Sequence, residues 1–166
     1  SLSLLEGTGI DLPLARFVQP RLEPEIVLGL ARTPASDRPE DLIAATAWIA
    51  HGFEVVQSVY PDWVFTAAET QAAQALHAAL RVGPQVPVSA FEDPLAQLAG
   101  LTIELMCDGR HVATGHGRDV LDGPVQALGY LVRQLQALGR RLNGGDVVTT
   151  GTLTDAQPLV PGQMWT

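Results

Sequence analysis

Two acids that lie two residues apart in an apolar segment are the feature of this sequence best suited to chemistry. Glu23 and Glu25 interrupt residues 22–28, which are otherwise apolar. On a β-strand, residues i and i+2 point to the same face at a spacing of roughly 6–7 Å, so the two carboxylates would lie side by side. A hard divalent cation, which prefers oxygen ligands, would hold such a pair together. A solvated strand edge, where two neighbouring acids cost little, is the alternative interpretation.

A third acid and an arginine accompany this pair. Glu54 lies within the apolar segment 53–56 and could complete a set of three carboxylates from two strands, with positions left for water and substrate. The alternative is an acid that faces solvent. Arg21 shares the strand face of Glu23 and Glu25, where it could balance their charge or bind an anionic ligand. A surface ion pair would explain Arg21 equally well.

Near the C-terminal end, residues 146–154 combine β-branched residues with a central glycine. On the expected strand, Thr150 and Thr152 would face the same way, and Gly151 would let a ligand approach the backbone closely. Such hydroxyls and amides suit a carboxylate or a developing oxyanion, so these three residues join Arg21 as candidate substrate-binding residues. A threonine-rich strand that reflects β-propensity alone is the alternative.

The sequence does not identify a catalytic acid, base or nucleophile. All ten basic residues are arginine, so no lysine of this chain can form a Schiff base or transfer a proton. The four histidines lack the spacing of a metal motif, and no nucleophile elbow is present. The catalytic residues stay unknown, with Glu69 and His77 as the remaining candidates. His77 lies on a predicted helix, where it could serve packing alone.

Composition indicates a globular protein and narrows the choice of partners. The 166 residues are 46% hydrophobic and 17% charged, which suffices for a substantial core. A net charge of −8 argues against nucleic acid and against an anionic membrane surface. No apolar run approaches the roughly 18 residues of a membrane span, and no secretory signal is visible. Because Cys107 is the one cysteine, no internal disulfide can form, and we expect a cytoplasmic protein.

The pattern of elements favours an α+β fold in a single domain over residues 1–166. Strands are predicted at 17–31, 53–60, 101–107, 111–115 and 146–154, with another beginning at 158. Two or three flanking helices are expected, over 40–50, over the alanine-rich segment 67–80, and from 124 to 142. The last helix has an apolar stripe at steps of three or four, and Arg140 and Arg141 fall in its final turn. This order is not a regular βαβ alternation.

Three segments, taken in order, resemble the fumarylacetoacetate hydrolase superfamily: residues 19–27, residues 53–56 followed by 62–63, and residues 145–154 followed by 161–162. The closer resemblance is to the branch of 2-keto-4-pentenoate hydratases and related 2-oxo acid decarboxylases. It implies the mixed, barrel-like β-roll of the family's catalytic domain and a homo-oligomer. It also implies Mg²⁺ or Mn²⁺ bound by Glu23, Glu25 and Glu54, and a substrate that contacts Thr152.

By this resemblance, the function is that of a metal-dependent lyase in aromatic catabolism. The expected reaction is hydration of a short 2-oxo or 2-hydroxydienoic acid such as 2-hydroxypenta-2,4-dienoate. A 2-oxo acid decarboxylase or an acylpyruvate hydrolase on the same scaffold, and a non-catalytic binding protein, are the alternatives. Family members carry a preceding segment with a functional lysine and aspartate, and continue into a further strand. We expect this chain to lack both, and therefore to bind metal yet turn over the dienoate poorly by itself.

Overall fold

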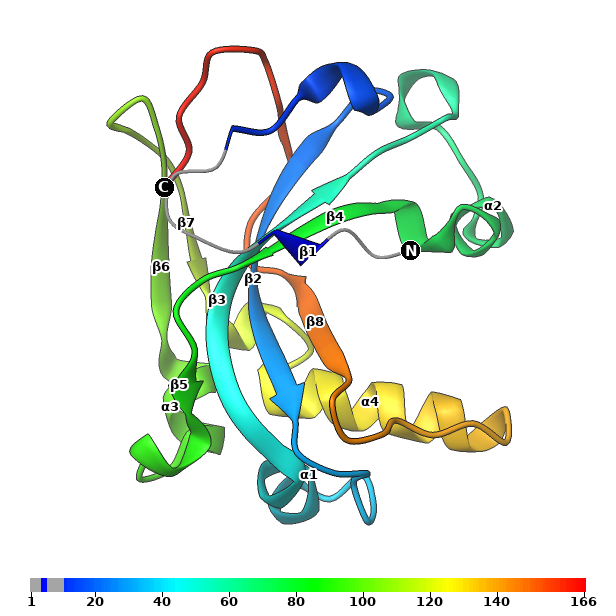
Figure 1. Cartoon of the computed structure of the whole chain (residues 1–166), viewed down its shortest axis with the longest axis vertical. Coiled ribbons are helices and arrows are strands. Elements are labelled where there is room, and N and C mark those ends of the chain that lie inside the picture. The colour runs from blue at the N-terminus through cyan, green and yellow to red at the C-terminus, as the bar shows by residue number, and fades with distance from the viewer. Residues whose placement is uncertain (1–3, 6–10) are drawn as a thin grey trace.

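A strongly curved sheet organises the protein in the computed structural model, which describes residues 4–5 and 11–166 (Figure 1). Its strand order is β1-β4-β3-β2-β8, with short strands β5 and β9 paired to β3 and β2; within the described residues all of its pairings are antiparallel except β1 with β4. The strands of this sheet are β1 (Leu4–Leu5), β2 (Arg21–Leu30), β3 (Thr46–Val56), β4 (His77–Val82), β5 (Val86–Pro87), β8 (Val147–Thr152) and β9 (Gln157–Pro158). A separate hairpin pairs β6 (Thr102–Cys107) with β7 (Arg110–His116).

Four α-helices lie within the described residues, so the expectation of two or three was too low. They are α1 (Pro39–Ala45), α2 (Ala67–Ala72), α3 (Pro94–Gly100) and α4 (Pro124–Ala137). Single 3₁₀ turns lie at Leu14–Arg16, Pro61–Trp63, Gln74–Leu76, Val88–Ala90 and Gly117–Asp119. The helix that was missed, α3, is short but has clear start signals: the Asp93 side chain accepts a hydrogen bond from the Ala96 amide, and Pro94 occupies the first turn. None of the helices in the described segments is long and apolar enough to cross a membrane.

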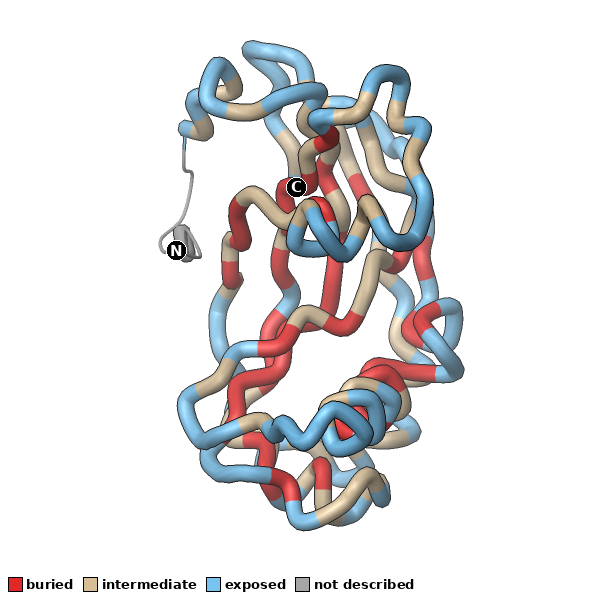
Figure 2. Tube along the Cα trace, turned by 90° about the vertical axis from the view of Figure 1, so that its right-hand side faces the viewer, coloured by how far each residue is buried: buried red, intermediate tan, exposed pale blue. Residues whose placement is uncertain are grey.

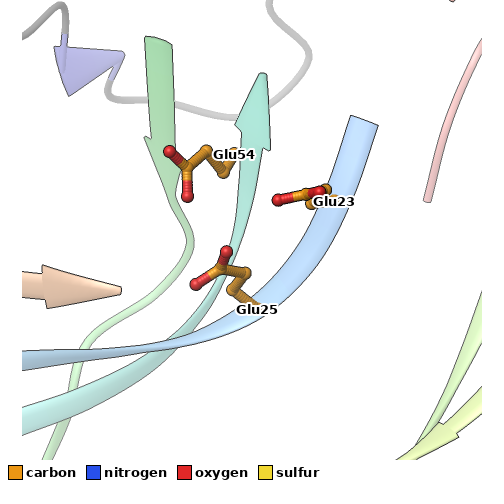
Figure 3. A group of neighbouring side chains, drawn as sticks. All are labelled: Glu23, Glu25 and Glu54. Atoms are coloured by element: carbon orange, nitrogen blue, oxygen red, sulfur yellow. The ribbon is translucent and has the colours of Figure 1, made fainter. Parts of the chain in front are cut away.

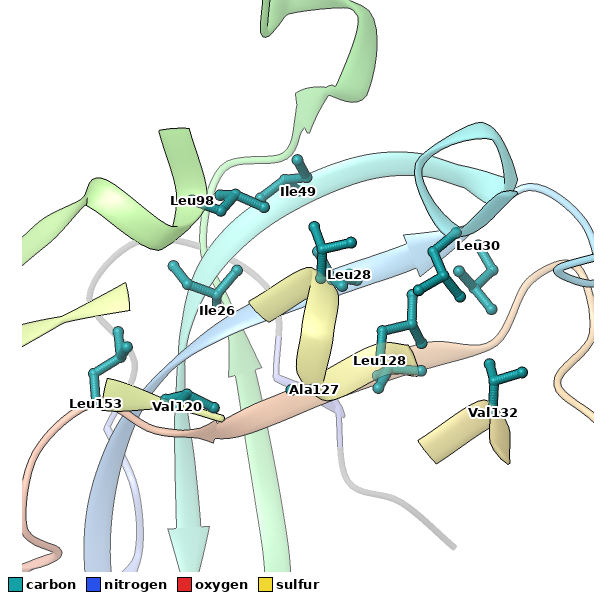
Figure 4. Packing of buried hydrophobic residues seen from close by; sticks show 13 residues of the cluster. Ile26, Leu28, Leu30, Ile49, Leu98, Val120, Ala127, Leu128, Val132 and Leu153 are labelled. Atoms are coloured by element: carbon teal, nitrogen blue, oxygen red, sulfur yellow. The ribbon is translucent and has the colours of Figure 1, made fainter. Parts of the chain in front are cut away.

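Helices α1, α3 and α4 cover one face of the curved sheet. On β2, Ile26, Leu28 and Leu30 alternate along the strand and point into the main core, where Leu128 of α4 packs against them (Figure 4). The remaining buried members of this core are Leu42, Ile49, Leu98, Val120, Val125, Ala127, Val132, Val148 and Leu153. Buried positions accordingly follow the central strands and the sheet-facing side of α4 (Figure 2).

The opposite face of β2 has a smaller core and the acids of interest. Val27 is fully buried there with Ala50, Leu80 and Val82, against the half-buried Trp48. Because side chains alternate along a strand, this face also carries the odd-numbered residues at the start of β2. The hydrophobic core and the acidic residues of β2 are therefore separated by the sheet itself.

Three predicted helix boundaries were wrong. The segment 67–80 forms only the short α2, because Gln74, Ala75 and Leu76 have positive φ angles that end the helix, and the following residues pair with β3 as β4. Tertiary pairing here overrides the helix propensity of alanine. Likewise, residues 46–50 belong to β3 rather than to the first helix.

The final helix, α4, is also shorter than predicted. It ends at Ala137, and Gly139 follows with a φ of 67°, a conformation typical of a helix terminus. Arg140 and Arg141 therefore lie beyond the helix and not in its last turn.

We expect Leu128→Ala to lower the free energy of unfolding by about 2–5 kcal/mol, because the side chain is only 1% exposed and its removal leaves a cavity between α4 and β2. Urea unfolding followed by circular dichroism measures this loss. The matched control is Leu138→Ala just after the same helix: this leucine is 71% exposed, so its truncation should change stability by about 0.5 kcal/mol at most. Equal effects of the two substitutions would contradict the packing described here.

Candidate metal centre

The register of β2 and β3 brings three carboxylates together. Glu23 lies directly opposite Glu54, and Glu25 follows two residues later on the same face of β2. One carboxylate oxygen from each residue lies within 4.8 Å of the other two, and the three side chains point toward one another (Figure 3). Gly52 is the residue opposite Glu25, so no side chain from β3 occupies the space across from that carboxylate. The structure thus brings together the three acids that the sequence singled out.

Burial makes this convergence energetically expensive for a protein without a cation. Glu25 and Glu54 are 3% and 8% exposed. The pKa of Glu23 is raised to about 7, first by burial and then by the charge of Glu54, while the Arg21 guanidinium acts to lower it. Burial, followed by the hydrogen bond and charge of Glu54, also raises the pKa of Glu25 well above its usual range. A bound dication would reverse this situation, since it favours the ionised form of all three groups.

Strand β8 supplies a backbone donor to this group through a β-bulge. Thr152 pairs with Glu25 and Thr149 with Val27, so two residues of β8 lie opposite Ile26 alone. At the bulge, Gly151 has a φ of 112°, and its amide donates a 2.8 Å hydrogen bond to Oε2 of Glu25. This bond holds the Glu25 carboxylate in one orientation.

The two threonines beside Gly151 do not occupy equivalent environments, because the bulge interrupts the simple alternation that the sequence suggested. Thr150 is buried, and its hydroxyl donates to the carbonyl of Ile26 at 3.0 Å. Thr152 is half-buried, and its hydroxyl donates to the carbonyl of Thr154 at 2.7 Å. Thr152 also lines an open hollow of about 500 Å³ next to β7, which none of the three glutamates lines.

Arg21 is held beside Glu23 by an aromatic ring rather than by an ion pair. Its guanidinium carbon lies 4.2 Å from the centre of the Trp63 ring, and the Trp63 indole donates to the carbonyl of Gln19 at 3.1 Å. Among the described residues, no carboxylate lies within ion-pair distance of Arg21. The guanidinium therefore keeps its planar set of donors for another anion.

Of the two remaining candidates for proton transfer, one caps a helix and the other contacts the acids. The Glu69 carboxylate accepts hydrogen bonds from the amide and the hydroxyl of Thr66 in a capping box at the start of α2, which lowers its pKa. The pattern Thr-x-x-Glu in the sequence could have revealed this role. His77, in contrast, lies on β4 with Nδ1 2.6 Å from Oε1 of Glu54. A helical prediction for residues 67–80 could not reveal that contact.

Comparison with known proteins identifies the fold and the family. The family model described as fumarylacetoacetate (FAA) hydrolase, C-terminal, matches residues 3–164. A solved structure of 4-oxalocrotonate decarboxylase from Pseudomonas putida G7, complexed with magnesium and adipate, superposes with a TM-score of 0.84 at 22% identity, over 99% of this chain and 59% of that one. The expected mixed α+β fold of the family is therefore confirmed, as a sheet that does not close on itself.

Three curated relatives are similar over nearly the whole chain. A 2-hydroxyhexa-2,4-dienoate hydratase from Comamonas testosteroni is 32% identical over 97% of this chain and 59% of its own length. A 2-keto-4-pentenoate hydratase from Burkholderia vietnamiensis is 35% identical over 91% of this chain and 57% of its own length. A 4-oxalocrotonate decarboxylase from a Pseudomonas species is 32% identical over 95% of this chain and 59% of its own length. The predicted branch of the family is confirmed, and the chain spans less than three fifths of the length of these relatives.

The raised pKa values predict that the metal-free protein loses stability as the pH rises. Between the pKa of an unfolded glutamate, near 4.5, and about 7, the folded state keeps a proton on Glu23 that the unfolded state releases, and Glu25 extends this effect to higher pH. Urea unfolding in EDTA should therefore give a lower free energy at about pH 8 than at about pH 5. Glu23→Gln, which cannot ionise, should show a smaller decline. A parent protein that is more stable at the higher pH would contradict this account.

Proposed function

We propose that this chain, which belongs to the fumarylacetoacetate hydrolase family, forms the metal-binding part of a hydratase acting on a short 2-hydroxydienoic or 2-oxo acid. The observation that carries the proposal is the convergence of Glu23, Glu25 and Glu54 to within 4.8 Å on one face of the sheet. The identity of 32% and 35% to two hydratases of such acids supports the choice of reaction. 2-Hydroxypenta-2,4-dienoate is the substrate we would test first.

The donor set fits a divalent cation, with Mg²⁺ or Mn²⁺ as the specific proposal. All three ligands would be carboxylate oxygens, which these hard cations prefer, whereas zinc sites usually include cysteine or histidine. His77, the histidine that contacts the group in the described part of the chain, already uses its nearer ring nitrogen in a hydrogen bond with Glu54. A cation held here would supply a Lewis acid for the carboxylate and 2-oxo oxygens of the substrate.

The remaining groups of the site would orient ligands and balance charge. Three carboxylates and one dication leave a net charge of about −1, which repels a 2-oxo acid anion. Arg21, stacked on Trp63 and without an ion-pair partner among the described residues, would offset that charge and receive the carboxylate of the substrate. The Gly151 amide would keep Glu25 in its ligating orientation. Thr152, opposite Glu25, is the proposed hydroxyl contact, for which its hydroxyl would exchange its bond to the Thr154 carbonyl for one to the substrate. Thr150 would act by fixing the bulge.

Decarboxylation of a 2-oxo acid is the second candidate, because the decarboxylase relative is as similar as one of the hydratases. The same bound acid and the same cation would serve either reaction, so the proton-transfer groups decide between them. This chain contains no lysine, so a lysine that transfers a proton would have to come from the longer proteins of this family. Loss of the dienoate's ultraviolet absorbance, compared with release of carbon dioxide from 4-oxalocrotonate, distinguishes the two reactions.

A homo-oligomer in the cytoplasm remains our prediction for the protein.

Titration calorimetry with Mn²⁺ tests the metal site. We expect the parent chain to bind one Mn²⁺, and we expect Glu23→Gln, Glu25→Gln and Glu54→Gln each to abolish measurable binding, because each removes one of three charged ligands. Glu104→Gln on β6 removes the same charge from an exposed position and should bind like the parent. Undiminished affinity in any of the first three variants would exclude that residue from the ligand set.

Arg21→Gln should separate ligand binding from metal binding. With Mn²⁺ in place, we expect this variant to bind pyruvate, a short 2-oxo acid, about 10–100-fold more weakly, because a charge-assisted hydrogen bond is lost. Its affinity for Mn²⁺ should stay the same or increase, since a positive charge beside Glu23 has been removed. Arg110→Gln on β7 is the control for a change in net charge alone. Parallel losses of Mn²⁺ and pyruvate affinity would contradict the assignment.

A further inference from the structure

Of the hydrogen bonds to the three acids within the described residues, the one from His77 is the shortest. Its Nδ1 lies 2.6 Å from Oε1 of Glu54, and the two side chains are only 18% and 11% exposed. At the start of β4, the register shifts between Ala79 and His77, so that His77 lies opposite Val56 on the strand that carries Glu54. Because Glu54 and Val56 are two residues apart on β3, the imidazole lies on the same face as the carboxylates.

The backbone around His77 fixes the ring relative to Glu54. The carbonyl of Leu76 accepts a 2.8 Å hydrogen bond from the Gln57 amide, which ties the residue before His77 to the end of β3. Leu76 itself is buried, in a turn with positive φ angles that directs the chain back along β3. The imidazole and the carboxylate are thus attached to adjacent, hydrogen-bonded strands and have little freedom to separate.

The chemistry of the contact determines the direction of the hydrogen bond. A carboxylate that binds a cation is ionised and can only accept, so Nδ1 of His77 must donate to Oε1. One oxygen of Glu54 is then held, which restricts rotation of the carboxylate and would leave its other oxygen for a cation. Partners of this kind around metal ligands orient the ligand, and their loss typically weakens metal affinity about 10–100-fold.

The other ring nitrogen indicates that this arrangement is more than incidental packing. Nε2 of His77 is buried and has no hydrogen-bond partner among the residues that the structure describes. A buried polar atom without a partner destabilises a fold, so an apolar residue would suit this position better if packing were its only role. The Nδ1 contact to Glu54 is the interaction that offsets this cost.

We propose that His77 is a positioning residue that fixes the Glu54 carboxylate for cation binding. This inference rests on the proposed metal site, but it concerns a residue outside the set of ligands. It predicts that cation affinity depends on the N–H group at the position of Nδ1 and not on the rest of the imidazole.

Four single variants of the whole chain test this proposal by calorimetry with Mn²⁺ at one fixed pH. His77→Ala should bind Mn²⁺ about 10–100-fold more weakly than the parent. His77→Asn, whose amide nitrogen can occupy the place of Nδ1, should recover most of the affinity, while His77→Gln, whose amide reaches to the place of Nε2, should not. His111→Ala, at an exposed histidine of β7, should bind like the parent. Thermal unfolding in EDTA verifies that each variant is folded.

The outcomes separate this inference from the proposed function. If the parent binds Mn²⁺ and His77→Ala binds it equally well, the positioning role is wrong while the metal site stands. If the Asn and Gln variants have the same affinity, the role of the Nδ1 donor is likewise rejected, and this comparison decides the matter even where the Ala variant fails to fold. If the parent itself binds no Mn²⁺, the proposed metal site fails, and with it the inference.

Discussion

Mutual repulsion among three closely spaced carboxylates is the constraint on which the arrangement of this protein depends. Glu23, Glu25 and Glu54 would separate in water, yet the pairing of β2 with β3 places them within 4.8 Å of one another. Desolvation adds to the repulsion, because two of the three are nearly fully buried. The rest of the fold must therefore supply the free energy that keeps these groups in place until a cation neutralises their negative charge.

The two faces of the central sheet have different roles: one carries the main stabilising core, and the other carries the acids. On one face, alternate residues of β2 pack against α1, α3 and α4 in the main hydrophobic core. On the other face, the smaller cluster around Val27 and Leu80 directly adjoins the acids and excludes water from them. Since the stabilising core lies across the sheet from the charges, the site can be strained without loosening the packing that holds it. Such separation is a general way for a fold to tolerate a destabilised functional site.

Much of the site could be read from the sequence because it depends on strand alternation. The spacing of Glu23 and Glu25 within an apolar run predicted both the strand and the shared face, and Glu54 followed from a second apolar segment. The bulge at Gly151 could not be predicted in this way, since it depends on which residues of β8 pair with β2. His77 was misplaced for a related reason: the left-handed turn before it involves Gln74, Ala75 and Leu76, residues that ordinarily favour a helix. Pairing with β3 decides the conformation there, and pairing between distant strands leaves little trace in local sequence.

Two of the irregular positions of the sheet complete the site. The bulge in β8 directs the Gly151 amide at Glu25, and the register shift in β4 places His77 against Glu54. Regular pairing would have provided the three carboxylates but no donors to orient them, because backbone amides of an unbroken ladder are already bonded to the neighbouring strand. Two of the three acids thus receive a hydrogen bond that fixes one oxygen, one from a backbone amide and one from a ring nitrogen. Glu23 lacks such a bond among the described residues and has the adjacent Arg21 instead. The regular pairing of β2 with β3 therefore sets the distance between the acids, and the irregularities in β8 and β4 set the orientation of Glu25 and Glu54.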